Sequence, residues 1–288
     1  MSLVINTNTD ALTAYRNLSN TQNKLSDAVT QLSSGLRINK AADDAAGLAI
    51  SQNLTSQVNG IGQAVRNAQD GINVVQTADG ALSETQNILQ RLNTLAVQSA
   101  NATNDDNARA DIQQEVNQDV TELNNIASGT KFNNIALLDG SFKSQTFQVG
   151  YQNDGTSKLN VTIDDMNATS LGLNSTGTGP DGKTSISGVD LTTQSGAQAA
   201  ITTIATALQT VSTQRAKLGA IQNSLQHTIN NLNVTQENLQ ASNSSIQDTD
   251  MAATMTSYTQ ANILSQAGTS MLKQANSEPN AILSLLQG

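Results

Sequence analysis

The chain has 288 residues, of which 37% are hydrophobic and 2% aromatic, and it contains neither Trp nor Cys. A net charge of −9 with scattered Lys and Arg argues against nucleic-acid binding, which needs clustered basic residues. The lack of Cys excludes disulfides and thiol chemistry, and no apolar run is long enough to span a membrane.

Charged residues make up 13% of the chain, roughly half the usual share in soluble proteins. Neutral Asn, Gln, Ser and Thr take their place. A neutral polar surface costs less to desolvate than one of Lys and Glu. We therefore expect the sides of the protein to be covered by neighbouring molecules, with a merely polar surface as the alternative.

Near the N-terminus, apolar residues recur at alternating steps of four and three. Eight of the ten positions in this register are apolar. The register consists of Val4, Asn8, Ala11, Tyr15, Leu18, Gln22, Leu25, Val29, Leu32 and Leu36. Such a seven-residue repeat is typical of helices that pack as coiled coils.

The same spacing continues in two further stretches. The first consists of Leu54, Val58, Ile61, Val65, Ala68, Ile72 and Val75. The second consists of Ile201, Ile204, Leu208, Val211, Arg215, Leu218, Gln222, Leu225, Ile229, Leu232, Gln236, Leu239, Asn243 and Ile246. A helix of about forty residues is about 65 Å long. This length favours an elongated rod over the alternative, a compact bundle with the same stripe.

Between these helical stretches the pattern changes. Gln145–Tyr151 and Lys158–Asp164 alternate as strands do, and the turn residues Asn153–Gly155 between them predict a β-hairpin. Asn167–Gln198 is rich in Ser, Thr and Gly, and predicts an exposed loop with no apolar stripe to bury.

The last stretch follows the register Ala261, Leu264, Gly268, Met271, Ala275, Glu278, Ile282 and Leu285. Together the stretches predict a mainly α fold, a long antiparallel coiled-coil rod formed by the N- and C-terminal halves, with a small β-hairpin region. A single narrow stripe cannot offset the entropy of ordering a chain end. We therefore expect the terminal segments to fold as neighbouring copies cover them.

No catalytic, cofactor-binding or metal-binding pattern stands out. His227 is the only histidine, which excludes sites that need two. The pairs Asp43–Asp44 and Asp105–Asp106 precede helical stretches, where acids stabilise helix N-termini, and this role is favoured over catalysis. We expect a structural protein without a cofactor, and not an enzyme.

Six separated blocks carry a more specific signal. They are Leu32–Ile50, Gln69–Leu82, Leu89–Gln98, Gln214–Asn223, Ile246–Asp250 and Gln266–Asn276. In this order they resemble the signatures of bacterial flagellins, over about residues 1–150 and 200–288. The resemblance implies a subunit that self-assembles into the helical flagellar filament for motility.

The resemblance also implies a division into parts. Residues 1–42 with 250–288 would form a terminal coiled-coil inner-tube domain, and 43–166 with 199–249 a helical rod domain with the β-hairpin. Residues 167–198 would be a short variable surface loop. Because this variable loop is so short, we expect a minimal type of flagellin that lacks large outer domains.

Two sets of site residues follow from the resemblance. Packing between subunits is expected from Leu18, Leu25, Val29, Leu32, Leu36, Leu264, Met271, Ile282 and Leu285. The family's contact positions for the innate immune receptor TLR5 correspond to Arg91, Leu95 and Glu115. The alternative is that these three residues serve packing between subunits in the filament.

The resemblance implies partners and a location as well. The partners are further copies of the chain in a helical homopolymer, a flagellar export chaperone, and cap and junction proteins. The location is extracellular, in the bacterial flagellum. Met1–Asp10 has no basic start and no apolar block, so export without a cleaved signal peptide is expected. The alternatives are a hook–filament junction protein, and a translocator or effector secreted by a needle-type system, which would carry a hydrophobic insertion segment.

Overall fold

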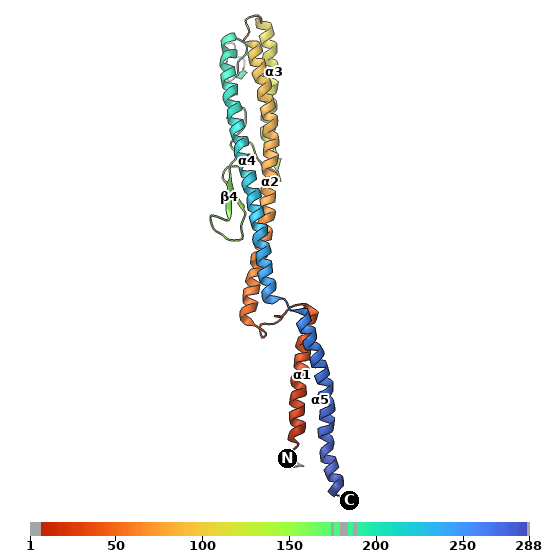
Figure 1. Cartoon of the computed structure of the whole chain (residues 1–288). Helices are drawn as coiled ribbons and strands as arrows, with labels where there is room; N and C mark the ends of the chain where they lie inside the picture. Colours follow the sequence, from red (N-terminus) through yellow and green to blue (C-terminus); the bar gives the residue numbers. More distant parts are fainter. Residues whose placement is uncertain (1–6, 174–175, 179–183, 187–188, 287–288) are drawn as a thin grey trace. The chain divides into compact units, whose positions relative to one another are not determined.

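The computed structural model of the chain describes residues 7–173, 176–178, 184–186 and 189–286. Its residues divide into two compact units, residues 1–58 with 237–288 and residues 59–236. The helices are α1 (Thr9–Ser34), α2 (Ala45–Ser99), α3 (Asp106–Gly129), α4 (Gln194–Gln247) and α5 (Met251–Leu286) (Figure 1). The mainly α, antiparallel fold is confirmed, and α3 is the helical stretch that was predicted to begin at Asp105–Asp106.

Acidic residues begin α2 and α3 as predicted. The side chain of Asp105 accepts a hydrogen bond from the backbone N–H of Ala108 at 2.8 Å. Ahead of α2, Asp44 accepts one from the N–H of Gly47 at 2.8 Å. Both carboxylates satisfy N–H groups that have no partner within the helix, so helix capping is confirmed for both acidic pairs.

The second unit is built around the antiparallel pairing of α2 with α4 (Figure 1). All fourteen positions of the stripe predicted between Ile201 and Ile246 are buried or half-buried in α4. The core side chains are mostly aliphatic, and Leu82, Leu92 and Leu123 show no exposed surface. Since the chain is poor in aromatic residues, Leu, Ile, Val and Ala fill this core.

A buried cation joins the end of α2 to α3. Arg109 has only 5% of its surface exposed. Its guanidinium donates hydrogen bonds to the carbonyl oxygens of Ser99 and Asn101. These carbonyls lie at the end of α2 and just after it, where a positive charge also interacts favourably with the helix dipole. Arg109 thereby fixes the turn between the two helices.

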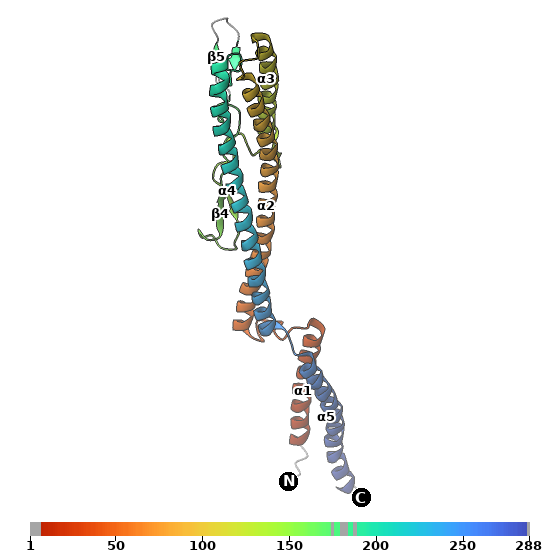
Figure 2. The ribbon, with the colours of Figure 1, turned by 45° about the horizontal axis from the view of Figure 1, so that its top comes forward.

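The strands form three two-stranded antiparallel sheets. The pairs are β1 (Lys131–Phe132) with β2 (Ile135–Ala136), β3 (Gln145–Gln148) with β4 (Lys158–Val161), and β5 (Thr176–Thr178) with β6 (Thr184–Ile186). The pairing of β3 with β4 confirms the predicted hairpin. In Figure 2 the strand β5 lies beside the first turns of α4.

The segment 167–198 differs from the exposed loop that was predicted. Six of its described apolar side chains are buried against the core of the second unit: Ala168, Leu171, Leu173, Val189, Leu191 and Ala197. In addition, α4 begins at Gln194, inside this segment. These apolar residues follow neither a helical nor a strand period, so the pattern of the sequence gives no sign of their burial.

In the first unit, α1 and α5 pack antiparallel. The side-chain amide of Asn8, which caps α1, donates to the carbonyl oxygen of Ala275 at 2.7 Å. At the other end of α1 the chain turns at Gly35, whose φ is 75°, and Leu36 forms an antiparallel β-bridge with Asp248. The break between α1 and α2 therefore lies beside the break between α4 and α5.

Candidate assembly surface

The least exposed positions of α1 and α5 repeat every four and three residues, and we call them the seam. On α1 the seam consists of Ala11, Ala14, Leu18, Thr21, Leu25, Ala28 and Leu32. On α5 it consists of Thr254, Tyr258, Ala261, Ser265, Gly268, Leu272 and Ala275. Most of these side chains are small, so the helices approach closely: a Cβ on Gly268 would lie 3.2 Å from Cδ1 of Leu18.

The seam is displaced by one residue from the predicted register at alternate positions. Ala28 takes the place of Val29 in α1, and Ser265 takes that of Leu264 in α5. The other displaced positions are Tyr15, Gln22 and Met271. In four of these five exchanges a smaller side chain takes the place of a larger one, as closely spaced helices favour.

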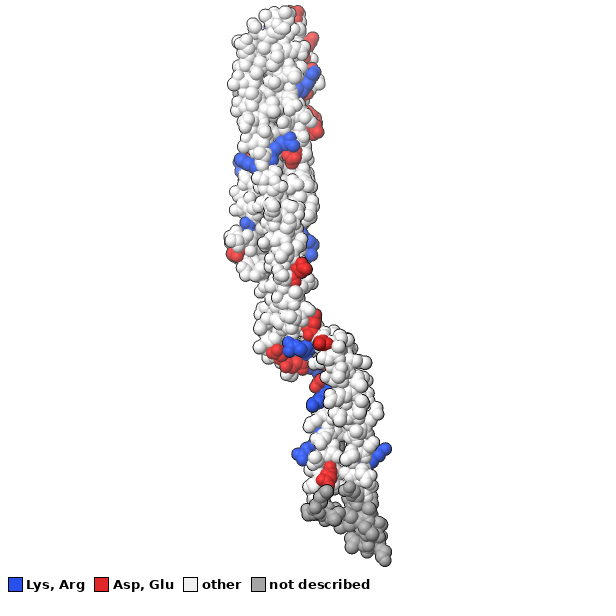
Figure 3. Space-filling model, viewed as in Figure 1, with Lys and Arg blue, Asp and Glu red and all other residues white. Residues whose placement is uncertain are grey.

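The large apolar side chains that the seam excludes are exposed, and we call them the outer apolar residues. They are Leu12, Tyr15, Val29, Met251, Met255, Ile263, Leu264 and Met271, with exposed fractions from 48% to 63%. No charged residue occurs between Asp250 and Lys273. In Figure 3 the surface over α1 and α5 shows few charged side chains. An uncovered apolar surface of this kind marks an interaction site.

A groove follows one side of the α1–α5 pair. It consists of two stretches of about 540 and 360 Å³, and Thr21 and Leu264 line both. The small seam residues Ala28 and Gly268 also line the groove, and Met271 borders its larger stretch. Large apolar residues therefore stand beside a hollow that an apolar side chain from another molecule can fill.

The residues predicted to pack subunits together fall into separate groups. Those buried or half-buried within the single chain are Leu18, Leu25, Leu32 and Leu36. Those among the outer apolar residues are Val29, Leu264 and Met271. The side chains of Ile282 and Leu285 lie outside the described ones, although α5 continues past both positions and through Pro279.

The predicted receptor-contact residues lie in the second unit and are not all accessible. Arg91 Nε donates to Glu115 Oε1 at 2.8 Å, and the two side chains are 57% and 43% exposed. Leu95 is only 2% exposed, because it lies on the face of α2 that packs into the core. A direct contact through Leu95 is therefore corrected to a packing role.

A second carboxylate lies one helical turn from Glu115. Asp119 has one oxygen buried without a hydrogen-bond partner among the described residues. Burial, and then the nearby negative charge of Glu115, raise the pKa of Asp119 above its usual value. Asp119 could not be singled out from the sequence, since its spacing does not differ from that of the exposed acids in the same helix.

Another hollow, of about 900 Å³, lies between the loop that joins β3 to β4 and α4. Most of the residues that line it have polar side chains, and they include Tyr151, Asp154 and His227. Within the described ranges, no group of three or more His, Asp or Glu side chains could hold a metal ion. No helix among the described residues is long and apolar enough to cross a membrane.

The first and last helices of the chain pair antiparallel and leave large apolar residues exposed. This arrangement is typical of structural subunits that associate through the helices at their chain ends. The comparisons with known proteins are specific. Residues 5–143 match the family model of the bacterial flagellin N-terminal helical region, and residues 201–286 match that of the C-terminal helical region.

Curated relatives are similar to this chain over its whole length. Flagellin of Halalkalibacterium halodurans is 44% identical over 285 residues, covering 99% of this chain and all of the relative. The flagellar filament 33 kDa core protein of Treponema phagedenis is 41% identical, over 99% of this chain and all of that protein. Flagellin A of Vibrio anguillarum is 37% identical, over all of both chains. The chain belongs to the bacterial flagellin family and is a structural subunit of the flagellar filament.

The chain is also a minimal member of this family. The alignment with the Vibrio anguillarum relative extends over 382 positions, whereas this chain has 288 residues. That relative therefore contains residues that have no counterpart here. Flagellins are structural proteins that polymerise into an extracellular filament, and the predicted fold class, family and role are confirmed.

Proposed function

We propose that copies of this chain join head to tail through the outer apolar residues of α1 and α5. The observation that carries the proposal is the displaced seam, which leaves Tyr15, Leu264 and Met271 exposed while small residues pair the helices. In the sequence, Leu285 falls two seven-residue steps after Met271, and Ile282 falls three residues before Leu285. Contacts between unlike faces of identical subunits add without closing and give an open helix.

The proposed packing residues then have two roles. Leu18, Leu25, Leu32 and Leu36 stabilise the helix pair inside each subunit. Val29, Leu264, Met271, Ile282 and Leu285 contact the neighbouring subunits. Fully burying a large apolar side chain is favourable by about 1.5–3 kcal/mol, so a few such contacts in each subunit are enough to drive assembly.

Substitution at Leu264 tests this proposal. Leu264→Asp places a charge on a face that has none between Asp250 and Lys273. We expect this variant to raise the critical concentration for polymerisation about tenfold or more. The control, Leu264→Met, keeps an apolar side chain of similar volume and should polymerise like the wild type. Sedimentation and electron microscopy measure the outcome, and normal tubes from Leu264→Asp would refute the proposed contact.

We further propose that the α1–α5 pair folds stably only as the subunit assembles. Inside the single chain the pair buries mainly small side chains, which contribute little apolar area to offset the entropy of ordering. Circular dichroism of the free subunit and of the filament tests the coupling. A gain in helix on assembly is expected, and equal helicity in the two states would count against it.

The proposed domain boundaries follow the two adjacent breaks in the helices. We propose that residues 1–42 with 250–288 form the inner tube and that 43–166 with 199–249 form the surrounding rod. Support comes from the turn at Gly35 and the β-bridge between Leu36 and Asp248. Limited proteolysis of the free subunit should cut near these breaks first. Residues 167–198 remain the proposed variable segment, with its ends anchored in the core.

For its route and partners we propose those of other flagellins: a flagellar export chaperone, and cap and junction proteins at the filament ends. Export without a cleaved signal peptide is part of the same proposal. N-terminal sequencing of filament protein tests it, and a start well beyond Met1 would contradict it. A hook–filament junction protein, in contrast, should not form long tubes alone, so electron microscopy of the protein polymerised alone distinguishes it from a filament subunit.

We also propose that the exposed Arg91–Glu115 pair is part of the surface that TLR5 recognises. Support comes from its exposure, since an accessible Arg beside a packed helix face is a common interface anchor. Purified monomer should activate a TLR5 reporter, and Arg91→Ala should weaken activation about tenfold. Arg66→Ala, at another arginine of α2 that bonds Gln63, is the control. No signal from the wild type would refute the proposal.

A further inference from the structure

Three methionines stand among the outer apolar residues, all on α5. Met251, Met255 and Met271 have exposed fractions of 50%, 53% and 63%. Met166, in contrast, lies in the core of the second unit with 1% exposed. The chain has five methionines in all, and Met1 lies outside the described residues. Thus most of its thioether groups are placed on the surface of a single helix.

We propose that Met251, Met255 and Met271 are oxidation sites at which hydrogen peroxide controls assembly of the subunit. The thioether sulfur attacks one oxygen of the peroxide, so that an S–O bond forms as the O–O bond breaks. The departing hydroxide takes up the remaining proton and leaves as water. The sulfur loses two electrons, the peroxide gains them, and the product is methionine sulfoxide, which sulfoxide reductases convert back.

Oxidation changes the polarity of these three side chains, which belong to the outer apolar residues. A flexible apolar side chain becomes a polar one with a strong hydrogen-bond acceptor. No charged donor is available along this part of the helix, since α5 has no charged residue between Asp250 and Lys273, and backbone N–H groups within a helix are already bonded. A sulfoxide buried between two subunits would lose its hydrogen bonds to water among apolar side chains, and this loss would oppose association.

The effect on assembly rests on the proposed function, in which the outer apolar residues contact neighbouring subunits. Under that arrangement the three methionines are open to peroxide only before a subunit is incorporated. The filament covers them, so the assembled polymer should resist oxidation that the free subunit does not. Oxidation of the three methionines therefore prevents the addition of new subunits and leaves existing filament intact.

Peptide mass spectrometry of peroxide-treated free subunit tests the sites themselves. Sulfoxide should form at Met251, Met255 and Met271 about tenfold faster than at Met166, because susceptibility follows exposure. The same treatment of preformed filament should oxidise the three positions several-fold more slowly. Equal rates at Met166 and at the three exposed positions would overturn the assignment.

Sedimentation of the treated subunit tests the consequence. We expect the polymerised fraction to fall about fivefold after oxidation and to recover with methionine sulfoxide reductases. The matched control is the triple variant Met251→Leu, Met255→Leu and Met271→Leu, which keeps apolar side chains and should polymerise equally with or without peroxide. If this variant fails to polymerise, recovery of the wild type by the reductases still decides the question.

The outcomes separate the two proposals. Normal polymerisation of fully oxidised wild type would overturn the control of assembly and leave the assembly surface standing. Normal polymerisation of Leu264→Asp would instead refute the assembly surface, and with it the proposed effect of oxidation. In that case the mass spectra alone still decide whether the three methionines are the oxidation sites.

Discussion

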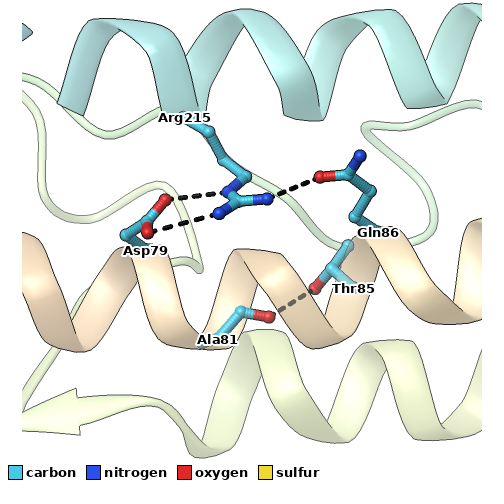
Figure 4. Close-up of polar contacts among 5 residues, drawn as sticks. All are labelled: Asp79, Ala81, Thr85, Gln86 and Arg215. Carbon is cyan, nitrogen blue, oxygen red and sulfur yellow. Dashed lines mark hydrogen bonds and ion pairs between the residues drawn. The ribbon is translucent and has the colours of Figure 1, made fainter. Parts of the chain in front are cut away.

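Arg215 of α4 donates from Nε to Asp79 Oδ1 of α2 at 2.8 Å, and from Nη1 to Gln86 Oε1 at 2.7 Å (Figure 4). It occupies a position of the seven-residue repeat that is otherwise mostly apolar. The hydrogen bond with Asp79 raises the pKa of Arg215. A charge at such a position fixes the register of two long helices, because a slip would leave it without its partners.

A double-mutant cycle should show the coupling of this pair. The side chains of Arg215 and Asp79 are 32% and 41% exposed, so the expected coupling from Arg215→Ala and Asp79→Ala is about 0.5–1 kcal/mol. The control is the pair Lys217 and Asp164, 3.5 Å apart and more than half exposed, which should couple by about 0–0.3 kcal/mol. Urea denaturation measures both, and equal coupling would contradict the assigned role.

Replacing Arg109 should destabilise the second unit strongly. Arg109→Ala leaves the carbonyl groups of Ser99 and Asn101 without their donor and opens a hole at the end of α2. Loss of about 2–3 kcal/mol is expected, since hydrogen bonds from a charged donor are among the stronger ones. Arg109→Lys keeps the charge and should lose less. If the free energy of unfolding of the alanine variant changed by less than about 0.5 kcal/mol, the hydrogen bonds of Arg109 would be dispensable.

Two helical glycines should respond in opposite directions. A Cβ at Gly219 would meet no atom within 4 Å, so Gly219→Ala should stabilise the second unit by about 0.5–1 kcal/mol. A larger side chain at Gly268 would press on Leu18, so Gly268→Val should lower the temperature at which filaments depolymerise. Thermal scans of free subunit and filament measure the two effects. An equally stable filament of Gly268→Val would argue against close packing at the seam.

The stability of the second unit should depend on pH through Asp119. Its pKa is raised in the folded state, so the folded protein holds the proton more tightly, and stability falls as pH rises from the unfolded pKa to the folded one. Asp119→Asn should therefore raise the unfolding midpoint at pH 7 and give no gain near pH 3. Asp111→Asn, at an exposed position of α3, removes the same charge as a control. A gain that persists at low pH would contradict the assignment.

The long helices of the second unit were predictable because their buried residues are large and evenly spaced. Val211, Leu218 and Leu225 recur in α4 at seven-residue steps, and the predicted stripe matches the buried face throughout. The hairpin of β3 and β4 was equally clear, since alternation and turn residues point to the same structure. The blocks of residues that resemble flagellins were what made the function predictable.

The terminal pair was predicted only in part. A search for large apolar residues selects Tyr15 and Leu264, whereas the seam uses Ala14 and Ser265. The sequence contains both sets one residue apart, and which set pairs within the chain depends on how closely two helices approach. That distance is a tertiary property, so periodicity alone cannot choose. Leu95 was named as a receptor contact through the resemblance alone, and its side chain faces the core.

The seam of small side chains also determines how the terminal pair responds to force. Two helices joined mainly through Ala, Ser, Thr and Gly lose few van der Waals contacts with each residue that is pulled free. Unzipping this pair therefore needs little mechanical work per step. A chain drawn end first through a narrow passage would resist least at its termini, and the aliphatic core around α2 and α4 would resist most.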